Sequence, residues 1–277
     1  MAKLLLFSLS FLLFLSTTAG DDPTAFVYAG CSQPRYAPGS PYQYNVESLL
    51  SSLANAAAFS SYSNFTSFSA SPSSPVFALF QCRGDLPLSE CSSCVRSALS
   101  RLSDLCPSAA SSAVQLRACY IRYGNDSFLG RPDTSLLYKT CATAAVAYGG
   151  GAFLASRDAA LSSLNTGTSY RVSATGAVRA EAQCVGDLDG GQCSECVAAA
   201  ATQVKASCGG AASGEAYLGK CYIRYYSNGA QPYAYGGGGG GEISGGEHGK
   251  LSCCYQWWLY LCYITFVLLI WDMNSLI

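Results

Sequence analysis

The 277-residue sequence has little charge and almost no histidine. Only 12% of its residues are charged and the formal net charge is −1, so it lacks the basic footprint that nucleic acid requires in a binding protein. The one histidine, His248, lies in a glycine-rich stretch, which argues against imidazole-based catalysis and Cys/His zinc sites. Half of the residues are apolar, so the chain can build a packed core and does not have the composition of a disordered protein.

The first 20 residues, MAKLLLFSLSFLLFLSTTAG, have the features of a secretory signal peptide. Lys3 supplies the positive charge, Leu4 to Leu15 form a short apolar run, and small residues follow up to Gly20. The run is shorter than the roughly 20 apolar residues of a membrane-spanning helix. We therefore expect export, and most of the 15 cysteines should be paired in an oxidising compartment.

The sequence contains a tandem repeat marked by cysteines. CRGDLPLSECSSC, residues 82–94, returns as CVGDLDGGQCSEC, residues 184–196, with the same C-x8-C-x2-C spacing. The same shift of 102 residues places Cys106 on Cys208 and the CYIRY at 119–123 on the CYIRY at 221–225. With one upstream cysteine each, Cys31 and Cys141, both copies hold six cysteines. Spacing alone does not choose among the fifteen pairings of six cysteines.

Hydrophobic periodicity predicts similar elements in both copies. In the first copy we expect helices over 45–59 and from Ser89, as the N-cap, to Leu105, with strands over 75–82 and 113–124. In the second copy we expect helices over about 152–164 and 191–206 and a strand over 215–226. Helices and strands without regular alternation predict an α+β fold, with helices on one face of an antiparallel sheet.

The C-x8-C-x2-C signature, the six-cysteine copy and the duplication resemble the plant ginkbilobin-like, or stress-antifungal, domain. The resemblance covers 24–129 and 137–235, joined at 130–136, and implies two domains, each a five-stranded antiparallel sheet with two helices and three disulfides. Carried over by position, the implied bridges are Cys31–Cys106, Cys82–Cys91, Cys94–Cys119, Cys141–Cys208, Cys184–Cys193 and Cys196–Cys221.

Two such domains without a kinase are similar to plasmodesmata-located proteins and cysteine-rich repeat secretory proteins. The resemblance implies a receptor-like protein with no enzyme activity, catalytic residue, cofactor or metal, which modulates cell-to-cell traffic through binding by its ectodomains. A secreted antifungal or lectin-like defence protein is the alternative. The expected partners are a cell-wall carbohydrate, a peptide or a membrane protein, and homo-oligomers are compatible with this reading.

The mannose site of the family's lectins is not preserved in the sequence. The resemblance assigns mannose contacts to an Asn, an Arg and a Glu at fixed offsets from the cysteines. Those positions hold Ser32, Ala113 and Gly124 in the first copy and Ala142, Glu215 and Tyr226 in the second. Alanine and glycine side chains offer no hydrogen-bond donor to a sugar hydroxyl, so we expect mannose binding at this position to be lost.

The C-terminal part predicts attachment to a membrane. A glycine-rich linker, 236–250, leads into 21 uncharged residues, Leu251 to Trp271, and a helix of that length would span about 31 Å. This favours a single-pass type I protein of the plasma membrane or plasmodesmata with the repeats outside. A lipid-anchor signal, with small residues near Ser244–Gly246, or secretion is the alternative. Cys253, Cys254 and Cys262 fall in this segment, and their state is left open.

Three further motifs have a structural and a functional interpretation. We interpret the Cys-x-x-Cys units as structural rather than as oxidoreductase or zinc centres, because the framework gives every repeat cysteine a partner. Asn64, placed in a serine-rich loop, and Asn125 begin sequons and are predicted glycosylation sites. Arg122 and Arg224 are interpreted as partly exposed strand residues whose stems pack on tyrosines, with ligand contact as the alternative.

Overall fold

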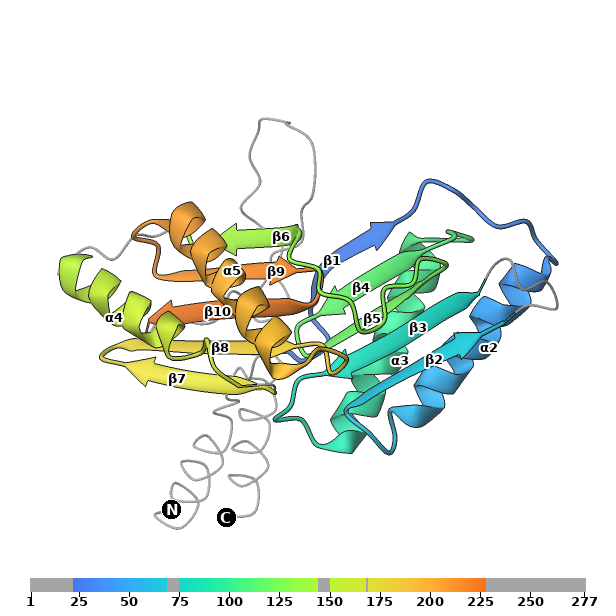
Figure 1. Cartoon of the computed structure of the whole chain (residues 1–277), viewed down its shortest axis with the longest axis horizontal. Coiled ribbons are helices and arrows are strands. Elements are labelled where there is room, and N and C mark those ends of the chain that lie inside the picture. Colours follow the sequence, from blue (N-terminus) through green and yellow to red (C-terminus); the bar gives the residue numbers. More distant parts are fainter. Residues whose placement is uncertain (1–21, 69–74, 144–149, 168, 228–277) are drawn as a thin grey trace, which may run out of the picture. The chain divides into compact units, whose positions relative to one another are not determined.

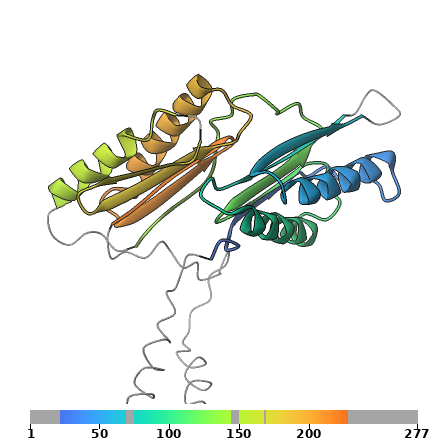
Figure 2. The same ribbon diagram turned by 90° about the horizontal axis from the view of Figure 1, so that it is seen from below.

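The computed structural model describes residues 22–68, 75–143, 150–167 and 169–227 (Figure 1). The predicted signal peptide, the glycine-rich linker and the apolar segment from Leu251 to Trp271 lie outside these residues. Two five-stranded antiparallel sheets are present, with two helices each, which confirms the α+β prediction. The helices of each domain cover one face of its sheet (Figure 2).

Both sheets have the same topology. The first has the strand order β1-β4-β5-β3-β2 and the second the order β6-β9-β10-β8-β7. The first domain comprises β1 (Phe26–Cys31), α2 (Pro41–Ala56), β2 (Tyr62–Ser67), β3 (Val76–Cys82), α3 (Leu88–Leu105), β4 (Ser112–Leu116) and β5 (Cys119–Gly124). The second comprises β6 (Leu136–Cys141), α4 (Gly150–Ser162), β7 (Arg171–Thr175), β8 (Val178–Cys184), α5 (Gly190–Cys208), β9 (Ser213–Leu218) and β10 (Cys221–Ser227).

The prediction of one continuous strand over 113–124 was wrong. The chain forms a hairpin there, because β4 ends at Leu116, Arg117 and Ala118 make the turn, and β5 returns antiparallel. The expected strand over 215–226 is likewise two strands, β9 and β10, separated by Gly219 and Lys220. Turn residues such as Gly, Asn and Pro are absent at 117–118, so the first copy carries no local turn signal.

Helix starts also differ from the prediction. α3 begins at Leu88 with Pro87 at its N-cap, so Ser89 is inside the helix and does not cap it. α2 begins at Pro41, earlier than predicted, because the Ser40 side chain accepts a hydrogen bond from the Gln43 N–H. A proline at the first helical position costs no hydrogen bond, since that N–H has no partner within the helix.

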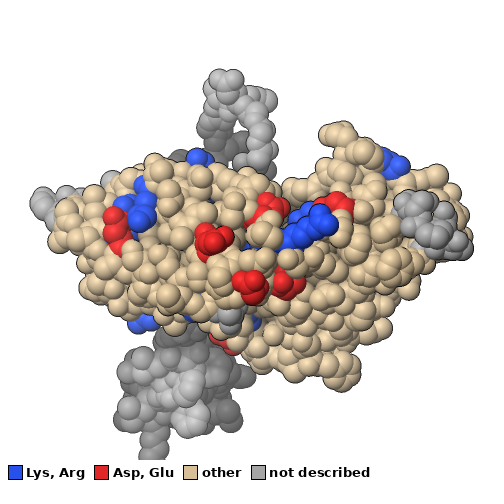
Figure 3. Space-filling model, in the orientation of Figure 1, with Lys and Arg blue, Asp and Glu red and all other residues tan. Residues whose placement is uncertain are grey.

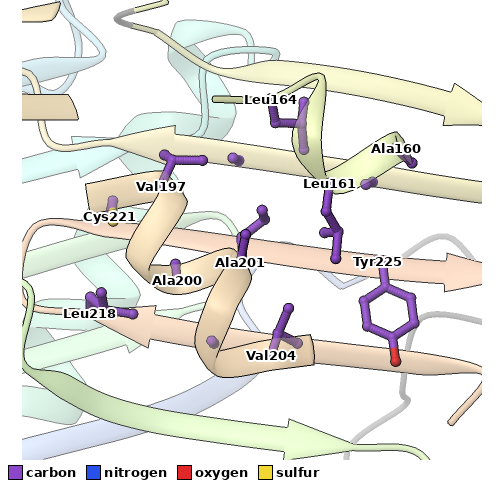
Figure 4. Close-up of a cluster of buried hydrophobic side chains, with 14 of the residues drawn as sticks. Ala160, Leu161, Leu164, Val197, Ala200, Ala201, Val204, Leu218, Cys221 and Tyr225 are labelled. Atoms are coloured by element: carbon purple, nitrogen blue, oxygen red, sulfur yellow. The ribbon is translucent and has the colours of Figure 1, made fainter. Parts of the chain in front are cut away.

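Each domain has a core between its helices and its sheet. In the second domain, Leu161 of α4 and Val197 and Val204 of α5 point toward Leu218 of β9 and Tyr225 of β10 (Figure 4). Strand side chains alternate between the two faces of a sheet, so the residues between these core positions lie on the face without helices. That second face brings the two domains together.

Six disulfides in the described residues link helices to strands, and most of their cysteines belong to these cores. The bonded pairs are Cys31–Cys106, Cys82–Cys91, Cys94–Cys119, Cys141–Cys208, Cys184–Cys193 and Cys196–Cys221. These are the pairs that the resemblance implied. In each domain, one bridge closes a loop with a sequence separation of 9 residues, between a sheet strand and the following helix.

Candidate functional site: the domain interface and the linker pocket

The two domains meet through the faces of their sheets that carry no helices. Leu79 and Tyr120 of the first domain pack with Val185 of the second in one buried apolar cluster. Next to it, Tyr28 of β1 stacks on Tyr138 of β6, with ring centroids 5.9 Å apart. The interface therefore combines an apolar centre with aromatic contact between edge strands.

A buried ion pair crosses the interface. Arg117 Nη1 lies 2.7 Å from Glu215 Oε2, and the two side chains are only 5% and 7% exposed. Glu215 also accepts a hydrogen bond from the Tyr217 hydroxyl at 2.8 Å. Burial and the Glu215 charge raise the pKa of Tyr217 well above its usual value, so this hydroxyl remains a donor at physiological pH. Two charges held this far from water are costly to separate.

Two disulfide-closed loops make reciprocal contacts across the interface. Gly84 N donates to Gln183 Oε1 at 3.3 Å, and the equivalent Gly186 N donates to Gln81 Oε1 at 2.8 Å. A Cβ on Gly84 would lie 2.7 Å from Tyr170 Cβ. The repeated Gly-Asp-Leu of the sequence is thereby explained, because each glycine lets one loop approach the other domain closely.

The equivalent site in the other loop is equally tight. A Cβ on Gly186 would lie 2.8 Å from Tyr62 Cγ. Asp187, next to it, pairs with the buried Lys220 and accepts a hydrogen bond from Gly130 N at 2.8 Å. Burial lowers the pKa of Lys220 in spite of this carboxylate. The second loop is therefore bonded both to the first domain and to the middle of the segment that joins the domains.

That joining segment, 125–135, is here called the linker, and it forms one wall of an open cavity. The cavity has a volume of about 310 Å³, within the range of small-molecule sites, and we call it the linker pocket. Its lining comes from β1, β4, β5, the linker and β6, and it includes Tyr28, Ser32, Ser112, Ala113, Tyr120, Arg122, Asp133 and Leu137. The first domain supplies most of this lining, and Asp133 of the linker and Leu137 of β6 complete it.

Arg122 is the basic residue that lines the linker pocket, and two carboxylates lie close to its guanidinium. The Arg122 Nη2 lies 2.7 Å from Asp126 Oδ2, and Nη1 lies 3.8 Å from Asp133 Oδ2. The same guanidinium carbon stands 4.2 Å from the centroid of the Phe128 ring. Arg122 and Asp133 both line the pocket, which therefore offers donors and acceptors together but no surplus of positive charge.

A buried tyrosine hydroxyl also lines the pocket. Tyr120 is 6% exposed, and its hydroxyl lies near Arg122 but makes no hydrogen bond of normal geometry within the described residues. Burial raises its pKa to about 12, so it is a neutral donor at physiological pH.

The residues at the positions of the family's mannose contacts have different surroundings in the two domains. Ser32 and Ala113 line the linker pocket, and Ala113 lies directly across from Arg122 in the β4–β5 ladder. At the third position, a Cβ on Gly124 would lie 2.5 Å from Asp126 Oδ1, so a larger residue does not fit beside this turn. In the second domain, Glu215 is taken up by its ion pair with Arg117.

The comparisons with known proteins agree with this architecture. The family model described as salt stress response/antifungal matches residues 30–126 and 140–228. Plasmodesmata-located protein 7 of Arabidopsis thaliana is 42% identical over 79% of this chain and 72% of its own length. The chain belongs to the plasmodesmata-located protein family. A second such relative, plasmodesmata-located protein 6 of the same plant, is 41% identical over 81% of this chain and 79% of its own length.

Solved structures of plasmodesmata-located proteins have the same tandem fold. The tandem DUF26 ectodomain of the Arabidopsis receptor-like protein PDLP8 matches with a TM-score of 0.71 and 39% identity, covering 74% of this chain and 99% of that chain. That of PDLP5 matches with a TM-score of 0.69 and 38% identity, covering 74% and 100%. The family's tandem ectodomain thus accounts for the described residues.

The arginines and sequons singled out in the sequence lie in unlike surroundings in this family member. Arg224 is buried and pairs with Glu181, so its interpretation as partly exposed was wrong. The first copy has Leu79 at the position of Glu181, so Arg122 has no equivalent carboxylate across the ladder. Arg122 is partly exposed, as expected, and lines the linker pocket. Asn64 is exposed but lies in edge strand β2, not in a loop.

Asn125 is exposed in the turn after β5, and glycosylation of either asparagine remains a prediction.

Within the described ranges, no group of three or more His, Cys, Asp or Glu side chains could hold a metal ion. No helix in the part of the chain that the structure describes is long and apolar enough to cross a membrane, and the segment from Leu251 to Trp271 lies outside that part.

Proposed function

We propose that this chain is a receptor-like protein without enzyme activity, which acts at plasmodesmata or the plasma membrane and modulates cell-to-cell traffic through binding by its ectodomains. Its membership of the plasmodesmata-located family and its likeness to tandem ectodomains of receptor-like proteins support the proposal. The observation that carries the binding part is the linker pocket, which β1, β4 and β5 of the first domain line together with Asp133 of the linker and Leu137 of β6.

The chemistry of the pocket favours a neutral carbohydrate of the cell wall over a peptide or a membrane protein. Sugar hydroxyls both donate and accept hydrogen bonds, and the pocket offers Arg122 as a donor and Asp133 as an acceptor. The rings of Tyr28 and Tyr120 add apolar surface. Acidic polysaccharides would meet the Asp133 carboxylate, and Arg122 already pairs with carboxylates, so they are disfavoured. On the face seen in Figure 3 most of the surface is uncharged, and acidic and basic side chains lie together near its middle.

Binding of wall oligosaccharides to the purified chain lacking residues 251–277 tests this assignment. We expect neutral oligosaccharides to bind, and Asp133→Ala to weaken them about 10- to 100-fold, the loss of a hydrogen bond to a charged group. Ala113→Phe fills the pocket beside Arg122 without removing a charged group and should abolish binding. Arg96→Ala, an exposed residue of α3, is the matched control and should change nothing. Binding restricted to basic peptides or to acidic pectin fragments would contradict the proposal.

The membrane part of the proposal has its own test. We propose a single-pass type I arrangement in which Leu251–Trp271 spans the bilayer, and a lipid anchor is the alternative. A fluorescently tagged chain should label punctate cell–cell junctions, and deletion of 251–277 should release it into the wall space. A signal that remains at the junctions after the deletion would show that this segment is not the anchor.

A secreted antifungal or lectin-like defence protein is the second candidate function. It is favoured by the family description, salt stress response/antifungal. It predicts that the intact chain is released into the medium and inhibits fungal growth there. Retention of the intact chain in the membrane fraction after high-salt washing separates the first candidate from the second.

A further inference from the structure

The guanidinium of Arg171 lies against one disulfide of the second domain. Arg171 Nη2 is 3.4 Å from Cys193 Sγ and 3.9 Å from Cys184 Sγ. Arg171 is the first residue of edge strand β7 and is partly exposed, whereas both sulfurs are buried. Its Nε is buried without a hydrogen-bond partner within the described residues. The cation therefore stands at this bridge with part of its bonding capacity unused.

The corresponding bridge of the first domain has a different neighbour. Arg171 pairs with Ala182 in the β7–β8 ladder, and Ser63 pairs with Phe80 in the β2–β3 ladder. The two registers are equivalent, so Ser63 occupies the place of Arg171 in the first copy. The chain thus contains two buried bridges of equal sequence separation, Cys82–Cys91 and Cys184–Cys193, one with a serine and one with an arginine at the same position.

We propose that Cys184–Cys193 is a thiol-exchange site, which a low-molecular-weight thiol or dithiol opens before Cys82–Cys91. A neighbouring cation lowers the pKa of a cysteine thiol, and a thiol of lower pKa is the better leaving group in exchange. Arg171 is always protonated, so it stabilises a thiolate at any physiological pH. The thiolate in turn gives the guanidinium an anionic partner, and no ion pair of Arg171 is present among the described residues in the oxidised state.

The exchange proceeds in two steps. The thiolate of the reagent attacks Cys184 Sγ, the bridge S–S bond breaks, and its electron pair leaves on Cys193 Sγ, the sulfur nearer to Arg171. The product is a mixed disulfide at Cys184 and a thiolate at Cys193. The second thiolate of a dithiol then attacks the reagent's own sulfur in this mixed disulfide and closes a cyclic disulfide, and Cys184 leaves as a thiolate. The dithiol is oxidised by two electrons and the bridge is reduced by two.

Opening this bridge would release contacts that hold the domains together. The loop that it closes contains Val185, Gly186 and Asp187, which contact the first domain and the linker. Asp187 accepts a hydrogen bond from Gly130 N in the middle of the linker, and the same linker supplies Asp133 to the linker pocket. The thiol exchange stands independently of the proposed binding function, and only its effect on the pocket rests on that function.

Partial reduction of the full-length protein in detergent tests the proposal. The protein is treated with increasing dithiothreitol, free thiols are trapped by alkylation, and each bridge is quantified by peptide mass spectrometry. We expect Cys184–Cys193 to be opened first, at a rate about threefold above that of Cys82–Cys91, because only part of a one-unit difference in leaving-group pKa appears in the exchange rate. Equal rates for the two bridges, or earlier opening of Cys82–Cys91, would overturn the assignment.

Exchange of the neighbouring residue gives the decisive controls. Arg171→Gln should bring the opening rate of Cys184–Cys193 down to that of Cys82–Cys91, and Arg171→Lys should keep most of the difference. If Arg171→Gln does not fold, Ser63→Arg provides the converse test and should accelerate the opening of Cys82–Cys91. Each variant is first shown to contain all six bridges. A Ser63→Arg protein with an unchanged Cys82–Cys91 rate refutes the role of the cation.

Discussion

Removing one partner of the buried ion pair between Arg117 and Glu215 should destabilise the tandem ectodomain strongly. At 2.7 Å and with an effective dielectric constant of about 20, the attraction is on the order of 6 kcal/mol, and the loss of hydration offsets most of it. Removing one partner leaves the other charge buried without compensation, which costs about 3–5 kcal/mol. Glu215→Gln, which keeps an acceptor for Tyr217, should therefore destabilise strongly.

The expected shift is large enough to measure by calorimetry. For a protein of this size, each kcal/mol changes Tm by about 2–4 °C, so Glu215→Gln should lower Tm by about 6–20 °C. Arg117→Met should cost a similar amount, and the double variant should recover most of the loss because no lone charge remains. Glu195→Gln, an exposed acid of α5, is the matched control. Additive losses in the double variant, or single losses below 1 kcal/mol, would refute the reasoning.

Three further predictions follow from the same contacts. Gly84→Val, whose Cβ would lie 2.7 Å from Tyr170 Cβ, should cost about 1–3 kcal/mol in urea unfolding, whereas Gly210→Ala, with no atom within 4 Å, should cost little; equal losses would contradict the close approach. Because burial raises the pKa of Tyr120 to about 12, the folded state retains a proton that the unfolded state releases near pH 10. The contribution of Tyr120 to the free energy of unfolding should be complete below about pH 10 and should decrease from there toward pH 12. The absorbance of tyrosinate monitors the deprotonation. A free energy of unfolding that does not change over this pH range would contradict the prediction. Replacing Cys31–Cys106 by alanines should cost about 4.5 kcal/mol and replacing Cys82–Cys91 about 2.5 kcal/mol, because the loops have separations of 75 and 9; a reversed order would contradict the entropic origin.

Sequence patterns predicted the repeat, the fold class and the approximate helices well, because these depend on local spacing. The duplicated cysteines and CYIRY define the two domains without any structure. The hairpins after α3 and α5 were missed because the alternation of apolar and other residues continues through the turn at Arg117. Residues on both faces of these strands are buried, so no exposed polar stretch marks the turn. The position of Asn64 was missed because its polar surroundings, YSNFTS, resemble a loop although they form an edge strand.

The interface and the linker pocket could not be derived from one copy at a time. Glu181 and Glu215 replace the Leu79 and Ala113 of the first copy, and a carboxylate at an interior strand position was a signal that the face is not an ordinary core. Its partner, Arg117, comes from the other domain, so only the docked pair explains both residues. The same holds for Asp133, which reaches the pocket from the linker.

Hydrogen–deuterium exchange with a bound wall oligosaccharide tests most directly whether this ectodomain recognises its ligand in the linker pocket. Protection should appear in the segments that carry Tyr28 to Ser32, Tyr120 to Tyr123 and the linker residues up to Leu137, and it should vanish in Ala113→Phe. Protection elsewhere would contradict the account, above all in the groove between α2 and α3 that Leu50 and Leu99 line.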